Sequence, residues 1–216
     1  MRLLILGTGN MARIQTRRGW GQIPGVEVVG GVDVDPANLD GYCAEFGEMR
    51  RFAALEAALE WGQFDAVTNV TPDSQHHATT LALLAAGKHV FGEKPLATDH
   101  ARAMEMTEAA ERSGLITMVN LTYRNVAELH RAREIVQLGA IGTVKHIEAS
   151  YLQQWLGLRD WSDPTVDGRF LWRLSKGHGS NGTLGDIGIH TLDFATYGAD
   201  LEVAKLNCRL QTFAKV

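Results

Sequence analysis

Three polar side chains have the types and the surroundings of a hydride-transfer site. Lys94 follows the short apolar run His89–Phe91 and precedes Pro95, and Asp186 and His190 lie four residues apart much later in the chain. A lysine cation stabilises a developing alkoxide or polarises a carbonyl. A histidine can remove a hydroxyl proton while a nearby aspartate orients the substrate or the imidazole. These residues predict oxidation of a hydroxyl group or reduction of the corresponding carbonyl.

The same side chains have other interpretations, which the sequence leaves open. Lys94 could be a surface lysine paired with Glu93. Asp186 and His190 are spaced by one helical turn, so they could also bind zinc, although the sequence shows no third ligand. They could equally be a helix cap and a core histidine. We predict no metal site and treat the three residues as candidate catalytic groups.

A glycine-rich segment near the start of the chain predicts the site of a dinucleotide. Gly7 and Gly9 follow an apolar run and open a helical pattern, and Ala12 completes the G-x-G-x-x-G/A fingerprint. Gly7 permits a tight turn, Gly9 lets the backbone approach a pyrophosphate, and the anion would rest on the helix N-terminus. A plain strand-to-helix turn is the alternative. The expected cofactor contacts in this segment are Gly7, Thr8, Gly9, Asn10 and Met11.

Asp33 predicts which dinucleotide is bound. It ends the second expected strand, 24 residues after Gly9, where an acid accepts hydrogen bonds from the adenosine ribose. A carboxylate there repels a 2′-phosphate, and no arginine lies beside it. NAD is therefore favoured over NADP, with a solvated turn residue as the alternative interpretation of Asp33.

Polar residues also follow the third and fourth expected strands. The carboxyl ends of parallel strands meet at one edge of a sheet, where ligands bind, so these residues are candidates for the cofactor site. Capping of a helix is the alternative for Asp73 and Ser74, and a histidine in a first helical turn is only weakly diagnostic. The candidates are Thr71, Pro72, His76, Glu93 and Lys94.

Short apolar runs alternate with amphipathic stretches through the first 120 residues, which predicts βαβ units and a doubly wound parallel sheet. This part, residues 1–120, is the expected dinucleotide-binding domain. The expected strands are Arg2–Leu6, Val26–Val34, Ala66–Val70, His89–Phe91 and Ile116–Val119. The expected helices are Asn10–Gly19, Pro36–Phe46, Ala53–Trp61, Ser74–Ala86 and Thr98–Ser113.

The pattern changes in residues 121–216, which predict an α+β domain that binds substrate. Alternating polar residues are typical of half-exposed antiparallel strands. Two such strands alone would leave exposed edges, so either the chain is a fragment or a partner chain completes the sheet. The expected elements are a helix at Ala127–Leu138, a strand at Val144–Leu152, a substrate loop at 153–183, a helix at Asp186–Tyr197 and a strand at Val203–Phe213.

Composition excludes several classes of partner. The 216 residues carry a net charge of -4 without clustered lysine or arginine, which does not favour nucleic acid. The two cysteines, Cys43 and Cys208, lack metal-site spacing and suit a reducing compartment. The first apolar run stops at Gly7, too short for a signal peptide, and no run approaches the roughly 18 apolar residues of a membrane span. We expect a cytoplasmic protein without membrane contact.

Four ordered motifs resemble those of the glucose-fructose oxidoreductase, inositol dehydrogenase and rhizopine-catabolism family of nicotinamide-dependent oxidoreductases. They are Leu4–Ala12, Ala86–Pro95, Gly139–Gly142 and Gly185–His190. The resemblance implies a Rossmann domain, then a domain with a large, mostly antiparallel sheet that commonly serves in oligomerisation, so we expect a homo-oligomer. It also implies that Lys94, Asp186 and His190 are the catalytic lysine, aspartate and histidine. Tyr123 and Arg124 match a segment that often lines the substrate pocket.

The leading hypothesis is an NAD-dependent dehydrogenase that oxidises a secondary hydroxyl of a sugar, cyclitol or related polyol. His190 would be the general base, Asp186 would orient it, and Lys94 would stabilise the alkoxide. Family members usually run well beyond this length, so a truncated, non-catalytic dinucleotide-binding or regulatory protein is the first alternative. The second is an imine or enone reductase, in which a lysine acid would matter more than His190.

Overall fold

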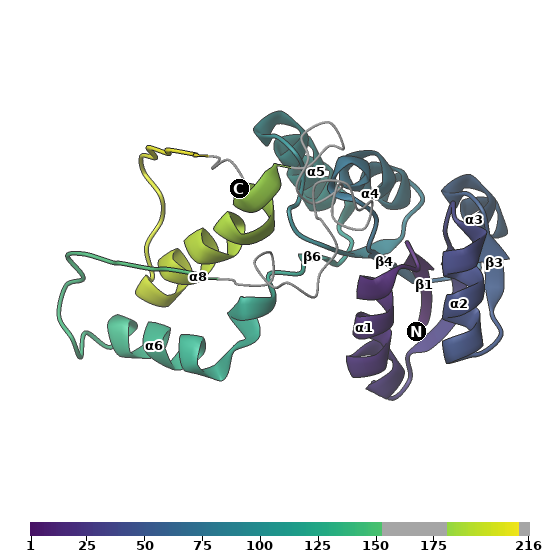
Figure 1. Ribbon diagram of the computed structural model, residues 1–216, viewed down its shortest axis with the longest axis horizontal. Helices are drawn as coiled ribbons and strands as arrows, with labels where there is room; N and C mark the ends of the chain where they lie inside the picture. Colours follow the sequence, from purple (N-terminus) through teal and green to yellow (C-terminus); the bar gives the residue numbers. More distant parts are fainter. Residues whose placement is uncertain (153–180, 212–216) are drawn as a thin grey trace, which may run out of the picture. The chain divides into compact units, whose positions relative to one another are not determined.

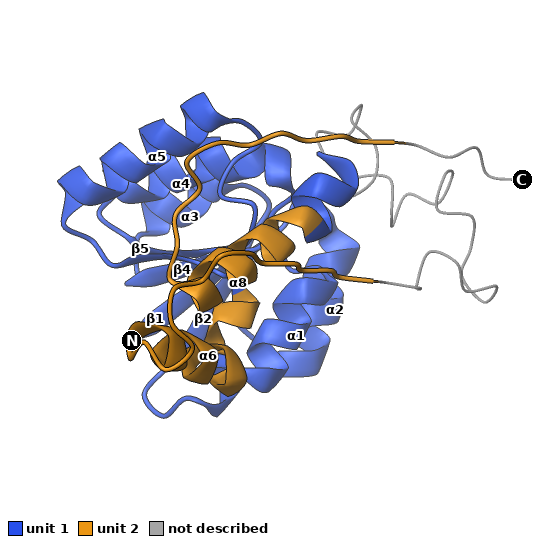
Figure 2. Cartoon of the chain, turned by 90° about the vertical axis from the view of Figure 1, so that its left-hand side faces the viewer, with its two compact units in different colours: residues 1–121, 153–187 blue, residues 122–152, 188–216 orange. Residues whose placement is uncertain are grey.

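The computed structural model describes residues 1–152 and 181–211. The chain divides into two compact units, one of residues 1–121 and 153–187 and the other of residues 122–152 and 188–216 (Figure 2). Most of the expected substrate loop and the end of the last expected strand fall outside the described residues. No described helix is long and apolar enough to cross a membrane.

Unit 1 is built on a six-stranded parallel sheet with the order β3-β2-β1-β4-β5-β6 (Figure 1). The chain first adds strands on one side of β1 and then returns to add strands on the other side, so the predicted doubly wound α/β fold is confirmed. The point where the order reverses lies between β1 and β4. The strands are β1 (Arg2–Leu6), β2 (Glu27–Val32), β3 (Arg50–Phe52), β4 (Ala66–Asn69), β5 (His89–Gly92) and β6 (Thr117–Val119).

The helices between the strands lie close to their predicted positions and follow local signals. Asp35 caps the second helix by accepting a hydrogen bond from Ala37 N, with Pro36 in its first turn. Asp99 caps the fifth in the same way through Arg102 N. The helical elements of this unit are α1 (Asn10–Arg18), η1 (Trp20–Gln22), α2 (Pro36–Phe46), α3 (Leu55–Trp61), η2 (Asp73–Gln75), α4 (His76–Ala85) and α5 (His100–Ser113).

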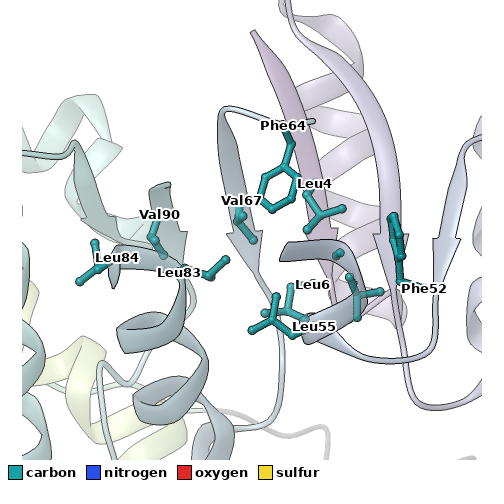
Figure 3. Close-up of a cluster of buried hydrophobic side chains, with 11 residues drawn as sticks. Leu4, Leu6, Phe52, Leu55, Phe64, Val67, Leu83, Leu84 and Val90 are labelled. Atoms are coloured by element: carbon teal, nitrogen blue, oxygen red, sulfur yellow. The ribbon is translucent and has the colours of Figure 1, made fainter. Parts of the chain in front are cut away.

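Two apolar clusters cover the two faces of the sheet. Successive side chains of a strand point to opposite faces, so Leu3 and Ile5 of β1 join the cluster against α1 and α2. Leu4 and Leu6 join the cluster against α3, α4 and α5 (Figure 3). Burying each such side chain stabilises the fold by about 1.5–3 kcal/mol. A strand that is buried on both faces has a continuous apolar sequence, which is why β1 could be predicted.

β3 is the strand that the sequence analysis missed. It contains three residues, of which Arg50 and Arg51 are exposed and Phe52 is buried. One apolar side chain in three residues gives no periodicity that could be recognised. The strand exists because its backbone pairs with Gly30–Val32 of β2 and because Phe52 enters the core.

Lys88 links the start of β5 to the end of α3. Its ammonium donates to the backbone oxygens of Gly62 at 2.9 Å and Phe64 at 2.6 Å, and it lies 4.4 Å from the centre of the Phe64 ring. Replacing Lys88 by methionine keeps the apolar stem but removes both hydrogen bonds. We expect this variant to lose about 1–2 kcal/mol of unfolding free energy.

Urea denaturation followed by circular dichroism measures the effect of Lys88→Met, with the exposed Lys145→Met as the matched control. The control should unfold at the same urea concentration as the wild type. Equal midpoints for both variants would show that the two hydrogen bonds do not stabilise the fold.

In unit 2 the helices η3 (Thr122–Asn125), α6 (Ala127–Gln137) and α8 (Ile189–Ala199) pack together. Asp200, just after α8, accepts hydrogen bonds from Arg133 and Gln137 of α6. The helix expected at Asp186–Tyr197 begins with a π-helical turn, η6 (Leu184–Gly188), before α8. That turn spans the end of unit 1 and the start of unit 2.

The strands expected in the second half are not formed in the described residues. The segments Val144–Leu152 and 203–211 have no regular secondary structure there, and the only described sheet is the parallel one of unit 1. A strand is defined by hydrogen bonds to a neighbouring strand. Alternation of polar residues indicates a half-exposed segment, but it does not identify the neighbour with which that segment pairs.

Candidate active site

The loops after four parallel strands carry most of the predicted cofactor contacts. Gly7 follows β1, Asp33 follows β2, Thr71 follows β4, and Glu93 lies just past the end of β5. Since all strands run in one direction, these loops lie at the same edge of the sheet. This is the edge where open α/β sheets bind ligands, next to the point where strand order reverses.

The fingerprint turn has the geometry that its glycines predict. Gly7 has a φ of +86°, and a side chain there would place its Cβ 2.7 Å from the Val70 oxygen. Ala12 is fully buried, so the helix packs closely on the sheet. No side chain caps the N-terminus of α1 at Gly9, and its backbone N–H groups suit an anion such as a pyrophosphate.

Asp33 is held by the fingerprint loop. Its Oδ2 accepts hydrogen bonds from Thr8 N at 2.7 Å and Thr8 Oγ1 at 2.9 Å, and Oδ1 accepts from Asp35 N at 2.9 Å. A carboxylate has about four acceptor positions, so Asp33 keeps capacity for a ribose hydroxyl. Thr8 is fully buried and turned toward Asp33, so its contact with the cofactor stays a prediction.

Asn69 fixes the loop after β4, and the sequence analysis missed it. Its side chain is fully buried. The amide oxygen accepts from Thr71 N at 3.3 Å and Thr71 Oγ1 at 2.7 Å, while the amide nitrogen donates to Thr79 Oγ1 at 2.8 Å. Asn69 therefore joins the Thr71 loop to α4. Two polar residues, Thr68 and Asn69, at the end of a strand that is buried throughout were the available signal.

His76 connects the loop after β4 with the turn that follows Lys94. The ring is 2% exposed, with Nδ1 2.7 Å from the Pro95 oxygen and Nε2 2.8 Å from the Thr71 oxygen. The Lys94–Pro95 peptide bond is cis. Both ring nitrogens face backbone oxygens, which favours a supporting role for His76, and its direct contact with a cofactor stays a prediction.

Asp73 is an acid close to the candidate catalytic groups. Burial raises the pKa of its carboxyl, the charge of Asp186 raises it further, and His76 and Lys94 partly offset this shift. When folding raises the pKa of a carboxyl, the ionised group destabilises the folded state. The stability of the protein therefore falls as the pH rises from the unfolded to the folded pKa. We expect Asp73→Asn to unfold at a higher temperature than the wild type at pH 7.5, and at the same temperature near pH 4.

Differential scanning fluorimetry across this pH range measures the effect of Asp73→Asn. The exposed Glu60→Gln serves as the control, because it removes one acid without removing a buried charge. If the unfolding temperature of Asp73→Asn exceeded that of the wild type by more at acidic pH than at pH 7.5, the raised pKa of Asp73 would be contradicted.

Lys94 and Asp186 are brought together although 92 residues separate them. Lys94 Nζ donates to Asp186 Oδ1 at 3.0 Å and to the Asp186 backbone oxygen at 3.1 Å. The side chains are 16% and 10% exposed, so this ion pair is largely shielded from water and each charge depends on the other. An ammonium has three N–H donors, and Asp186 accepts from two of them.

His190 is the second residue of α8 and lies in unit 2, where it is 8% exposed. The Tyr123 ring meets the imidazole edge to face, with 4.9 Å between ring centres. The hydroxyl of Tyr123 forms a hydrogen bond with that of Tyr151, a partner that the sequence analysis did not find. The Tyr123 ring thus contacts the histidine, and its hydroxyl group is paired with that of Tyr151.

Arg124 has a different environment from its neighbour Tyr123. Its guanidinium donates to both carboxylate oxygens of Asp193, with distances of 2.6 and 2.9 Å to Oδ1, and the pKa of Arg124 is raised by that hydrogen bond. It also lies 5.0 Å from the centre of the Tyr197 ring. Arg124 is therefore engaged with α8, and its contact with a substrate stays a prediction.

Comparison with known proteins identifies the family of this chain. Residues 1–121 match the model of an oxidoreductase family with an NAD-binding Rossmann fold, and residues 129–216 match the GFO/IDH/MocA C-terminal domain. The chain belongs to the GFO/IDH/MocA family. The family that the motifs resemble, glucose-fructose oxidoreductase, inositol dehydrogenase and rhizopine catabolism, is therefore confirmed.

Relatives within this family carry the names of sugar oxidoreductases. Levoglucosan dehydrogenase of Pseudarthrobacter phenanthrenivorans is 30% identical over 76% of this chain and 42% of its own length. The 1,5-anhydro-D-fructose reductase of Ensifer adhaerens is 31% identical over 78% of this chain and 48% of its own. The crystal structure of an oxidoreductase domain protein from Kribbella flavida superposes with a TM-score of 0.81 at 31% identity, over 92% of this chain and 53% of that one. The chain thus spans about half the length of the curated relatives it matches.

Proposed function

We propose that this protein transfers a hydride between NAD and a secondary hydroxyl of a sugar, cyclitol or related polyol. The observation that carries the proposal is the shielded Lys94–Asp186 ion pair at the cofactor edge of a Rossmann sheet. The names of the levoglucosan and anhydrofructose relatives support a cyclic polyol or its ketone as the substrate class.

The residues of this chain have distinct roles in the proposed reaction. The third N–H of Lys94 would donate to the reacting oxygen and stabilise the negative charge that develops on it. His190 would take the hydroxyl proton as the general base. Bound NAD would supply the hydride acceptor. The carbon that bears the hydroxyl group would lose a hydride as His190 takes the proton, so a secondary alcohol would become a ketone. Asp186 would keep the ammonium oriented, as its two hydrogen bonds to Nζ already do.

The cofactor would lie across the carboxyl edge of the sheet. The backbone of Gly7 to Met11 would bind the pyrophosphate, and Asp33 would accept hydrogen bonds from the adenosine ribose. Because Thr8 and Asp35 leave Asp33 some acceptor capacity, the carboxylate would select NAD against NADP. The loops that carry Thr71, Pro72 and Glu93 would lie along the nicotinamide half.

The second half of the chain, residues 121–216, is proposed to form the substrate domain, and residues 1–120 the dinucleotide domain. Tyr123 contacts His190 and pairs with Tyr151, and the hydroxyl groups of the two tyrosines suit a polyol. The segments 144–152 and 203–211 have no regular secondary structure in the described residues. We propose that they pair in a mostly antiparallel sheet of a homo-oligomer, which light scattering after size-exclusion chromatography would test.

NADH formation on a panel of sugars and cyclitols tests the proposed function, with the wild type, His190→Asn and an exposed control, Lys145→Met, side by side. NAD affinity is measured separately by calorimetry. Turnover that His190→Asn lowers by about a hundredfold or more supports a histidine base. Undiminished NADH formation in His190→Asn would remove His190 as the base. NADH oxidation by an imine or enone, without NADH formation from any polyol, would favour a reductase with a lysine acid. NAD binding without turnover on any substrate would identify a non-catalytic dinucleotide-binding protein.

A further inference from the structure

The carboxylate of Glu93, one residue before Lys94, is held by groups from other elements. Its Oε1 accepts hydrogen bonds from Gln15 Nε2 at 2.5 Å and Asn120 Nδ2 at 2.7 Å. Its Oε2 accepts from the backbone N–H of Lys94 at 3.2 Å. Gln15 lies on α1, and Asn120 directly follows β6. One carboxylate therefore joins the fingerprint helix, the end of β6 and the lysine backbone.

Thr68 sets the direction of the Gln15 amide. Its hydroxyl, fully buried on β4, donates to Gln15 Oε1 at 2.7 Å. With the amide oxygen engaged by this donor, the amide nitrogen faces Glu93 and can donate to it. The chain of hydrogen bonds from Thr68 through Gln15 to Glu93 is therefore directional, and each donor in it meets an acceptor.

Packing alone does not hold Glu93 in place. The residue borders a cavity of about 480 Å³, which Gly92 and Val119 also line. A side chain next to such a cavity has few van der Waals neighbours on that side. Besides the Lys94 N–H, the described hydrogen bonds that fix the carboxylate are those from Gln15 and Asn120.

We propose that Gln15 and Asn120 are positioning residues for Lys94 and act on it through the Glu93 carboxylate. Glu93 holds the lysine backbone by one N–H, while Asp186 holds the ammonium by two, so both ends of Lys94 are fixed. The expected effect of Gln15 and Asn120 on turnover rests on the proposed function. Their expected effect on the position of the Lys94 backbone does not, and the two effects can be measured separately.

Selective labelling with ¹⁵N-lysine tests the positioning directly, because the chain has six lysines. The Lys94 amide signal is assigned by its loss in Lys94→Arg. Gln15→Met removes the donor but keeps the length of the side chain, and it should shift the Lys94 amide more than any other lysine signal. Gln22→Met, at an exposed glutamine, is the matched control and should leave the Lys94 signal in place.

Asn120→Ala provides a second, independent variant if Gln15→Met does not fold. It removes the other donor to the same Glu93 oxygen and should shift the same amide signal. An unmoved Lys94 amide in the folded variants would overturn the proposal, whatever the enzyme's activity.

A double-mutant cycle then tests the consequence for chemistry, using the substrate found in the panel. Gln15→Met should lower kcat about tenfold in the wild type and less than about twofold in a Glu93→Gln background, because it acts through Glu93. NAD affinity should change little in either background. Equal losses of kcat in both backgrounds would overturn the route through Glu93. Absence of turnover in the wild type would instead count against the proposed function. The shift of the Lys94 amide signal would still decide whether Gln15 and Asn120 position Lys94.

Discussion

Replacing Lys94 by methionine is expected to lower kcat about a thousandfold or more, with little change in NAD affinity. The ammonium would donate to the reacting oxygen only as negative charge develops there, so its loss should affect the transition state more than the bound ground state. Stopped-flow measurement of NADH formation gives the rate of the hydride step, and calorimetry gives the affinity for NAD. A variant that retained most of its turnover would remove Lys94 from the chemistry.

The stability of this variant needs its own control, because Lys94→Met leaves Asp186 without its cation. The Asp186 side chain is 10% exposed, and breaking a buried pair at one partner costs about 3–5 kcal/mol. The double variant Lys94→Met/Asp186→Asn removes both charges and should recover much of that stability. It should recover no turnover, which separates the loss of chemistry from a loss of fold.

Much of unit 1 could be predicted because its signals are local. The continuous apolar run of β1 reflects burial on both faces of a parallel sheet, and Leu3 to Leu6 are all buried. Asp35 and Pro36 mark the start of α2 by capping geometry that involves only neighbouring residues. The fingerprint combines both kinds of signal, a buried strand and a helix start, and it was therefore located to the residue.

The partners that position the candidate site could not be predicted in the same way. Gln15 and Glu93 are 78 residues apart, and their hydrogen bond forms only because the fold brings α1 to the residue that follows β5. Nothing in the local sequence distinguishes Gln15 from an ordinary helix-surface glutamine. Asn69 and Tyr151 were missed for the same reason, since each acquires its role from a side chain that the fold brings to it.

The Lys94–Asp186 pair shows where family resemblance adds what local signals lack. The four-residue spacing of Asp186 and His190 predicted that the two residues lie on one helix face. Asp186 lies in a π-helical turn, and His190 lies at the start of α8, which directly follows that turn. The spacing did not predict the ion pair between Asp186 and Lys94. Ordered motifs from distant parts of the chain had implied that these two residues share a site.

Replacing each of the two fingerprint glycines by alanine should impair a different property, folding stability at Gly7 and NAD affinity at Gly9. At Gly7 the Cβ would lie 2.7 Å from a backbone oxygen, and the φ of +86° is unfavourable for any other residue. We expect Gly7→Ala to lose about 2–4 kcal/mol of unfolding free energy from overpacking and backbone strain. Urea denaturation measures this loss directly, without any ligand.

Gly9→Ala is the matched variant, because the same added methyl group meets no atom within 4 Å. Its φ of -69° is ordinary for alanine, so the folding free energy should stay within about 1 kcal/mol of the wild type. NAD affinity should nevertheless fall about tenfold or more, since the methyl group would occupy space into which the pyrophosphate must come. Equal stability of both variants would contradict the tight turn at Gly7. Unchanged NAD affinity in Gly9→Ala would show that the dinucleotide does not approach this backbone.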